Sequence, residues 1–228
     1  MRLDDICLVN SDVTASDDFY RLELGFERRM RNVRFVDFVF ATGPRLAMWM
    51  RPSITETVGS VYPTSPGLPF RVTVGDGSGM VDRVAIDPDG FATVLTPGVP
   101  RVTALELAVS DVGRTAAFLS TLGFAPAPGH GADAFDGGGL PIVLTPVTDV
   151  PLDDQVAPDG WTRNGGHVML AIELDTGDAV DRAHAELVAR GLQLSGEPAV
   201  YEWGARSTYA VDPDGFIWEI YAWVEEPR

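Results

Sequence analysis

The sequence predicts an α+β protein built from tandem β-α-β-β-β units. Three repeated motifs indicate these tandem units. Leu-Val-Asn-Ser-Asp-Val at 8–13 returns as Leu-Ala-Val-Ser-Asp-Val at 107–112, and Leu-Gly-Phe at 24–26 returns at 122–124. Asp-Pro-Asp-Gly-Phe at 87–91 returns at 212–216. Self-similarity of this kind indicates a duplicated chain.

Each half opens with the same order of elements. An apolar strand, at 5–10 or 104–109, runs into Ser-Asp, which is a typical helix N-cap signal. A helix is expected at 13–24 and at 112–122, and each is followed by glycine, Gly25 or Gly123. Short apolar runs then predict three strands per half, at 26–31, 35–41 and 46–51, and at 124–126, 132–136 and 142–146.

The end of the chain carries a second, complete unit. A strand at 167–174, an amphipathic helix at 178–190 and strands at 193–194, 207–211 and 217–222 are expected. Asp212-Pro213-Asp214-Gly215 is a turn sequence, so the last two strands form a hairpin. Alternation places Ile217, Glu219, Tyr221 and Trp223 on one strand face. A carboxylate among large apolar neighbours needs a metal, a cation or a bound ligand as its partner.

The matching unit of the first half is shortened. Phe70 lies 17 positions before Asp87, whereas Leu170 lies 42 positions before Asp212, so about one helix and one strand are missing. The glycine-rich stretch at 75–79 is expected to make the shortcut. We predict a degenerate N-terminal domain at 1–98 and a complete C-terminal domain at 100–228, with a long loop at 148–165 that is typical of a lid.

Composition excludes several classes of function. The net charge of −16 disfavours binding to nucleic acid or to anionic membranes. All basic residues are arginine, so Schiff-base lysine chemistry and a P-loop are excluded. The single cysteine, Cys7, excludes an intrachain disulfide, and no secretory signal or long apolar span is visible. We therefore expect a cytoplasmic protein, monomeric or homodimeric, that binds a small molecule.

The paired units, the Ser-Asp-Val and Leu-Gly-Phe motifs and the closing Asp-Pro-Asp-Gly-x-x-x-Glu resemble the vicinal oxygen chelate superfamily. That group includes glyoxalase I, bleomycin-resistance proteins and extradiol dioxygenases. The resemblance covers nearly the whole chain and implies that the units pair into cup-shaped mixed sheets around a cavity. Its metal-binding members place ligands on the first and last strands of each unit. Because members share a scaffold and differ in chemistry, the resemblance implies a particular reaction only where this chain has the matching ligand residues.

Carried onto this sequence, the resemblance gives an incomplete metal site. His167 and Glu219 fill two ligand positions for a divalent ion such as Zn, Ni, Mn or Fe, whereas the family's histidine position in the third unit is Ala104. Glu106 is one way to complete the set. The other is Asp5, which would join His167 and Glu219 if the first and last units pair. The region at 201–206 lacks the histidine of ring-cleaving dioxygenases.

Two functions from different classes follow. In the first, a lyase or isomerase uses a divalent metal on His167, Glu219 and Asp5, and Glu106 or Glu219 acts as the catalytic carboxylate. In the second, a cup without metal binds or sequesters a small molecule such as a cationic antibiotic. Arg206 either pairs with Glu219 or binds an acidic ligand. The expected ligand-binding residues are Met169, Tyr201, Trp203, Arg206 and Tyr221.

Overall fold

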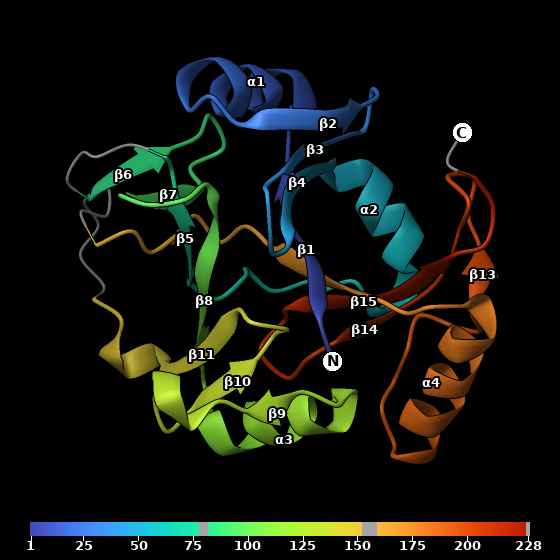
Figure 1. Cartoon of the computed structure of the whole chain (residues 1–228). Helices are drawn as coiled ribbons and strands as arrows, with labels where there is room; N and C mark the ends of the chain where they lie inside the picture. The colour runs from blue at the N-terminus through green and yellow to red at the C-terminus, as the bar shows by residue number, and fades with distance from the viewer. Residues whose placement is uncertain (78–81, 152–158, 227–228) are drawn as a thin grey trace.

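The computed structural model describes residues 1–77, 82–151 and 159–226, and its strands form two mixed sheets within those ranges (Figure 1). The eight-stranded sheet has the order β13-β14-β15-β12-β1-β4-β3-β2, and the seven-stranded sheet has the order β6-β7-β5-β8-β11-β10-β9. The α+β class and the repeated-unit architecture predicted from the sequence are confirmed.

The eight-stranded sheet combines the first unit with the last. The antiparallel pair β1 and β12 joins them, with Cys7 opposite Met169 at its centre. This is the pairing of first and last units that the sequence left open. The strands are β1 (Leu3–Asn10), β2 (Glu27–Arg31), β3 (Phe35–Val39), β4 (Arg45–Met50), β12 (Val168–Glu173), β13 (Ala199–Val200), β14 (Ala205–Val211) and β15 (Ile217–Trp223).

The seven-stranded sheet combines the second and third units through β5 and β8. Both sheets therefore contain hydrogen-bonded strands from each side of residues 98–100, where the sequence predicts a domain boundary. The strands are β5 (Phe70–Gly75), β6 (Arg83–Ile86), β7 (Ala92–Thr96), β8 (Arg101–Val109), β9 (Ala125–Pro126), β10 (Ala134–Asp136) and β11 (Pro141–Pro146).

The repeated Ser-Asp motif caps the first helix of each half, as predicted. Asp12 accepts hydrogen bonds from the backbone of Thr14 and Ala15, and Asp111 accepts one from Arg114. The helices are α1 (Val13–Asp18), which continues as a π-helical segment at Phe19–Glu23, α2 (Arg51–Val58), α3 (Val112–Leu122) and α4 (Gly177–Ala189). No helix in the described ranges is long and apolar enough to span a membrane.

One predicted strand needs correction, and two other predictions fall partly on residues outside the described ranges. The strand expected at 193–194 is an isolated bridge from Leu194 to Ala210, and the edge strand is β13 instead. Between β5 and β6 the described residues contain no helix, but 78–81, part of the predicted shortcut, lie outside them. The same holds for 152–158 in the predicted lid loop.

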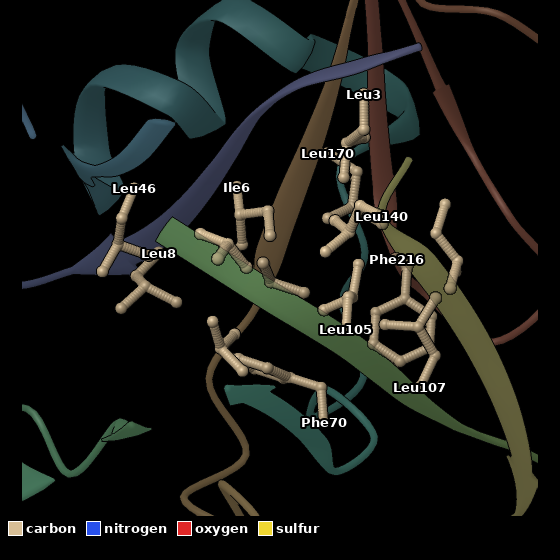
Figure 2. Close-up of a cluster of buried hydrophobic side chains, with 14 of the residues drawn as sticks. Leu3, Ile6, Leu8, Leu46, Phe70, Leu105, Leu107, Leu140, Leu170 and Phe216 are labelled. Atoms are coloured by element: carbon tan, nitrogen blue, oxygen red, sulfur yellow. The ribbon is translucent and has the colours of Figure 1, made fainter. Parts of the chain in front are cut away.

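One large apolar core lies between the sheets. Leucines and phenylalanines from both sheets meet there, including Leu8 and Leu170 of one and Phe70 and Leu105 of the other (Figure 2). Alternation along each strand turns the neighbouring side chains to the opposite faces. The side chains on the face of each sheet that points away from the shared core make a separate set of contacts. We call these faces cup A (eight strands) and cup B (seven strands).

Helix α2 covers one end of cup A and was not expected from the sequence. It contacts β1 and β4 (Figure 1), and Ile54 and Val58 are fully buried in a cluster with Cys7, Val9 and Met169. Its signals are Pro52 in the first turn and the four-residue spacing of the two apolar side chains. A cavity lined by Asp5 and Glu219 lies toward the other end of the cup.

Candidate ligand site in cup A

A row of facing residues forms the floor of the open end of cup A. Across β4, β1, β12, β15 and β14 the register aligns Arg45, Asp5, Ala171, Glu219 and Tyr209. Ala171 separates the two carboxyl positions, and its small side chain leaves space above the floor. A cavity of about 100 Å³ lies here, and both Asp5 and Glu219 line it.

Both carboxyl groups are deeply buried. Asp5 is 4% exposed and Glu219 is 7% exposed. Burial raises the pKa of both above the ordinary range, against the lowering effects of Arg45 on Asp5 and of the Tyr209 hydrogen bond on Glu219. Tyr209 donates to Glu219 over 2.8 Å. Within the described part of the chain, Asp5 Oδ1 has no hydrogen-bond partner.

Arg45 occupies the centre of an acidic cluster beside the cavity. Its guanidinium pairs with Asp4, lies 3.3 Å from Asp37 Oδ2 and lies 3.7 Å from Asp5 Oδ2. It also donates to the Tyr221 hydroxyl over 3.1 Å, and Tyr221 donates to Asp4 over 2.6 Å. The sequence-based prediction missed Arg45, Asp4 and Asp37. A lone carboxylate at position 37 in an apolar strand is the same signal that singled out Glu219.

Aromatic rings form the walls of the cavity. Trp49 and Trp203 meet edge to face with ring centroids 5.3 Å apart, and Tyr221 and Trp223 do so at 5.7 Å. Tyr201 stacks on Trp203 at 4.7 Å and supports it from outside the lining. Such rings attract organic cations through their negative faces. The lining residues are Asp5, Arg29, Met30, Asn32, Phe35, Arg45, Trp49, Met169, Ala171, Trp203, Ala205, Glu219, Tyr221 and Trp223.

The structure brings some of the predicted site residues together and leaves others apart. Met169, Trp203 and Tyr221 line the cavity with Asp5 and Glu219. Arg206 points to the other face of β14, where its guanidinium pairs with Asp181 of α4 over 2.7 Å. Glu106 lies in the other sheet and pairs with Arg71.

His167 also lies apart from the two carboxyl groups. It precedes β12 by one residue and stands four positions from Ala171, about 13 Å along the strand. The ring contacts Tyr62, and burial, followed by the charge of Arg51, lowers its pKa. Helix α2 packs on Met169, two residues along the chain from His167.

The donor set does not fit a resident divalent metal. Among described residues no group of three histidine, cysteine or acidic side chains is arranged to hold an ion. Three carboxylates do converge, Asp4, Asp5 and Asp37, but they surround the guanidinium of Arg45. A cation of the chain itself therefore stands where a metal would need these oxygens.

A family model for the Glyoxalase/Bleomycin resistance protein/Dioxygenase superfamily matches residues 99–220. The chain belongs to this superfamily. Its resemblance to the vicinal oxygen chelate group, predicted from the sequence, is confirmed. A search of curated proteins found no match.

Solved structures support the fold. Two point variants of glyoxalase I from Zea mays align with TM-scores of 0.61 and 0.58, at 14% and 12% identity. The alignments cover 97% of this chain in both cases, and 92% and 93% of the maize chains. A putative dioxygenase from Bacillus subtilis aligns with a TM-score of 0.61 at 14% identity, over 99% of this chain and 86% of its own. At these identities the likeness concerns the fold alone.

Proposed function

We propose that this protein binds a small organic cation in the cavity of cup A without using a metal ion. The observation that carries the proposal is the combination of Asp5 and Glu219 on the floor with aromatic walls above them. An ammonium group would donate to Asp5 Oδ1, which has no partner among the described residues, and lie against the rings. The chain's net charge of −16 favours the approach of a cation.

The size of the cavity suits one ring or a short aliphatic group. Its volume of about 100 Å³ is of the order of apolar cavities, roughly 150 Å³, that take up one benzene molecule. Benzylamine is therefore a suitable probe, and benzyl alcohol is a neutral molecule of the same shape. A ligand that binds only the native state raises the melting temperature by mass action.

The test compares the two probes in thermal-shift and calorimetric titrations. Benzylamine should bind and stabilise the protein, and benzyl alcohol should bind at least tenfold more weakly. Asp5→Asn should lose most of this preference, whereas Asp133→Asn, a change of an exposed carboxylate, should keep it. Equal binding of both probes, or no binding of benzylamine, would overturn the proposal.

The competing proposal is a metal-dependent lyase or isomerase, and the same thermal-shift assay tests it. Stabilisation by Zn, Ni, Mn or Fe ions that disappears in Glu219→Gln and His167→Ala would favour it. Our proposal expects no stabilisation by these ions, because the Arg45 guanidinium already pairs with Asp4 and lies beside Asp37.

A further inference from the structure

A second hollow adjoins the cavity of cup A on its outer side. It has a volume of about 270 Å³, larger than the inner cavity, and is lined by Asn32, Val33, Arg34, Trp49, Ser53, Glu202 and Trp203. These residues come from two regions far apart in the sequence. Residues 32–34 form the turn between β2 and β3 of the first unit, and 202–203 form the turn between β13 and β14 of the last unit.

The two hollows meet at a pair of tryptophans. Asn32, Trp49 and Trp203 line both of them. Trp49 is held in place by its indole N–H, which donates to Ser53 Oγ over 3.0 Å, and Trp203 is held by the stacked ring of Tyr201. A ligand seated in the inner cavity can therefore extend outward along fixed aromatic surfaces.

The chemistry of the outer hollow differs from that of the inner one. Its polar groups are an amide, a hydroxyl, a guanidinium and a carboxylate, without a buried acidic floor. Arg34 and Glu202 form an ion pair of 3.5 Å across it, with side chains 57% and 79% exposed. Exposed pairs of this kind contribute little, so Arg34 is available to a ligand group at small cost.

We infer that the two hollows are the two halves of one elongated binding site, and that its ligand has a cationic head and a polar tail. The head lies between Asp5 and Glu219, the middle passes Trp49 and Trp203, and the tail accepts hydrogen bonds from Arg34 and Asn32. This inference rests on the proposed function, because the inner half must first bind the cation.

The test uses a short and an extended probe in calorimetric titrations. Benzylamine fills only the inner half, and 4-(aminomethyl)benzoyl-glycinamide adds an amide tail at the opposite end of the ring. The extended probe should bind at least tenfold more tightly than benzylamine. A third probe, 4-pentylbenzylamine, has an apolar tail and should show no gain of that size.

Variants locate the gain. In Arg34→Ala the extended probe should lose its advantage, so that the affinities for the two probes become equal. Arg21→Ala removes another half-exposed, ion-paired arginine, from a position outside both hollows, and should keep the full gain. Binding of benzylamine without a gain for the extended probe overturns this inference alone. Failure of both probes to bind overturns the proposed function as well.

Discussion

Cup A and cup B come from the same repeated unit, yet only one of them carries the cavity described above. In cup A, Asp5 and Glu219 lie in a cavity with one carboxylate oxygen left unpartnered among the described residues. In cup B the acidic residue Glu106 is paired with Arg71, whose guanidinium lies 5.1 Å from the ring of Trp161. Trp161 in turn packs on Val150 and Ala108 of the same face.

This difference shows how duplication separates stability from binding. Both sheets contribute to one shared core, so each is needed for the fold. A covered outer face adds buried area and satisfied charges, whereas the open face keeps a buried carboxylate oxygen, Asp5 Oδ1, without a hydrogen-bond partner among the described residues. We therefore expect substitutions in cup B to change stability and substitutions in cup A to change binding.

The largest effect is expected in cup B. Trp161 is 5% exposed, and Trp161→Ala should lower the free energy of unfolding by about 3–5 kcal/mol, as large-to-small changes of buried aromatic residues do. Benzylamine affinity should stay within twofold of the wild type. Denaturant unfolding and calorimetry measure the two quantities. A loss of binding larger than the loss of stability would break the separation.

The next effect compares the two carboxylates. Glu219→Gln should weaken benzylamine binding about 10- to 100-fold, because a hydrogen bond to a charged group contributes about 1.5–3 kcal/mol. Glu106→Gln, the same change in cup B, should leave the affinity unaltered, since Glu106 faces Arg71. Similar losses in both variants would mean that binding does not reside in cup A.

Two equivalent aspartates that hydrogen-bond from one sheet to the other are expected to differ less in their effect on stability. Asp214 accepts from the backbone N–H of Ser110 over 3.0 Å and from Thr115 over 2.6 Å, whereas the equivalent Asp89 accepts from the exposed Ser11. Asp214→Asn should cost about 1–3 kcal/mol, and Asp89→Asn less than about 1 kcal/mol. Chemical denaturation checks the order, and equal losses would contradict the view that burial distinguishes the two aspartates.

The smallest effect is a pH dependence of binding. Burial raises the pKa of Asp5 and of Glu219, so both ionise only as the pH rises above the ordinary carboxyl range. The affinity for benzyltrimethylammonium, whose charge does not titrate, should therefore increase several-fold between about pH 5 and about pH 8. The charged and titratable groups around this pair are Asp4, Asp37, Glu173, Arg29, Arg45, Tyr209 and Tyr221.

Calorimetry at several pH values measures this dependence. The direction follows from the pKa shifts, since a cation binds best to the ionised carboxylates and its binding releases protons. In Glu219→Gln the increase should be smaller, because one of the two titrating groups is gone. An affinity that falls as the pH rises would show that these carboxyl groups do not hold the cation.

Local signals in the sequence were sufficient for the repeated elements. Asp12 and Asp111 cap helices as expected, and Gly90 and Gly215 take the positive φ of 84° and 91° that the two Asp-Pro-Asp-Gly turns need. The strand face that carries Glu219 was also predictable, because alternation is a local property. Two residues of the cavity walls, Trp203 and Tyr221, were also predicted from the sequence.

The remaining features depend on contacts between distant segments. Arg45 meets Asp5 because β1 and β4 are parallel neighbours, and it reaches Tyr221 because the first and last units share a sheet. No local pattern encodes that pairing. The distance of His167 from Glu219 has a similar origin, since the pairing of β12 with β15 places Ala171 beside Glu219, four positions along the chain from the histidine.

A crystal structure with 4-bromobenzylamine tests the central claim most directly. The anomalous signal of bromine locates the ring, and the electron density locates the amine. We predict that the ring lies against Trp49 and Trp203 and that the amine lies within hydrogen-bond distance of Asp5 or Glu219. A ligand bound in cup B beside Trp161, or with its amine directed away from both carboxyl groups, would contradict the account.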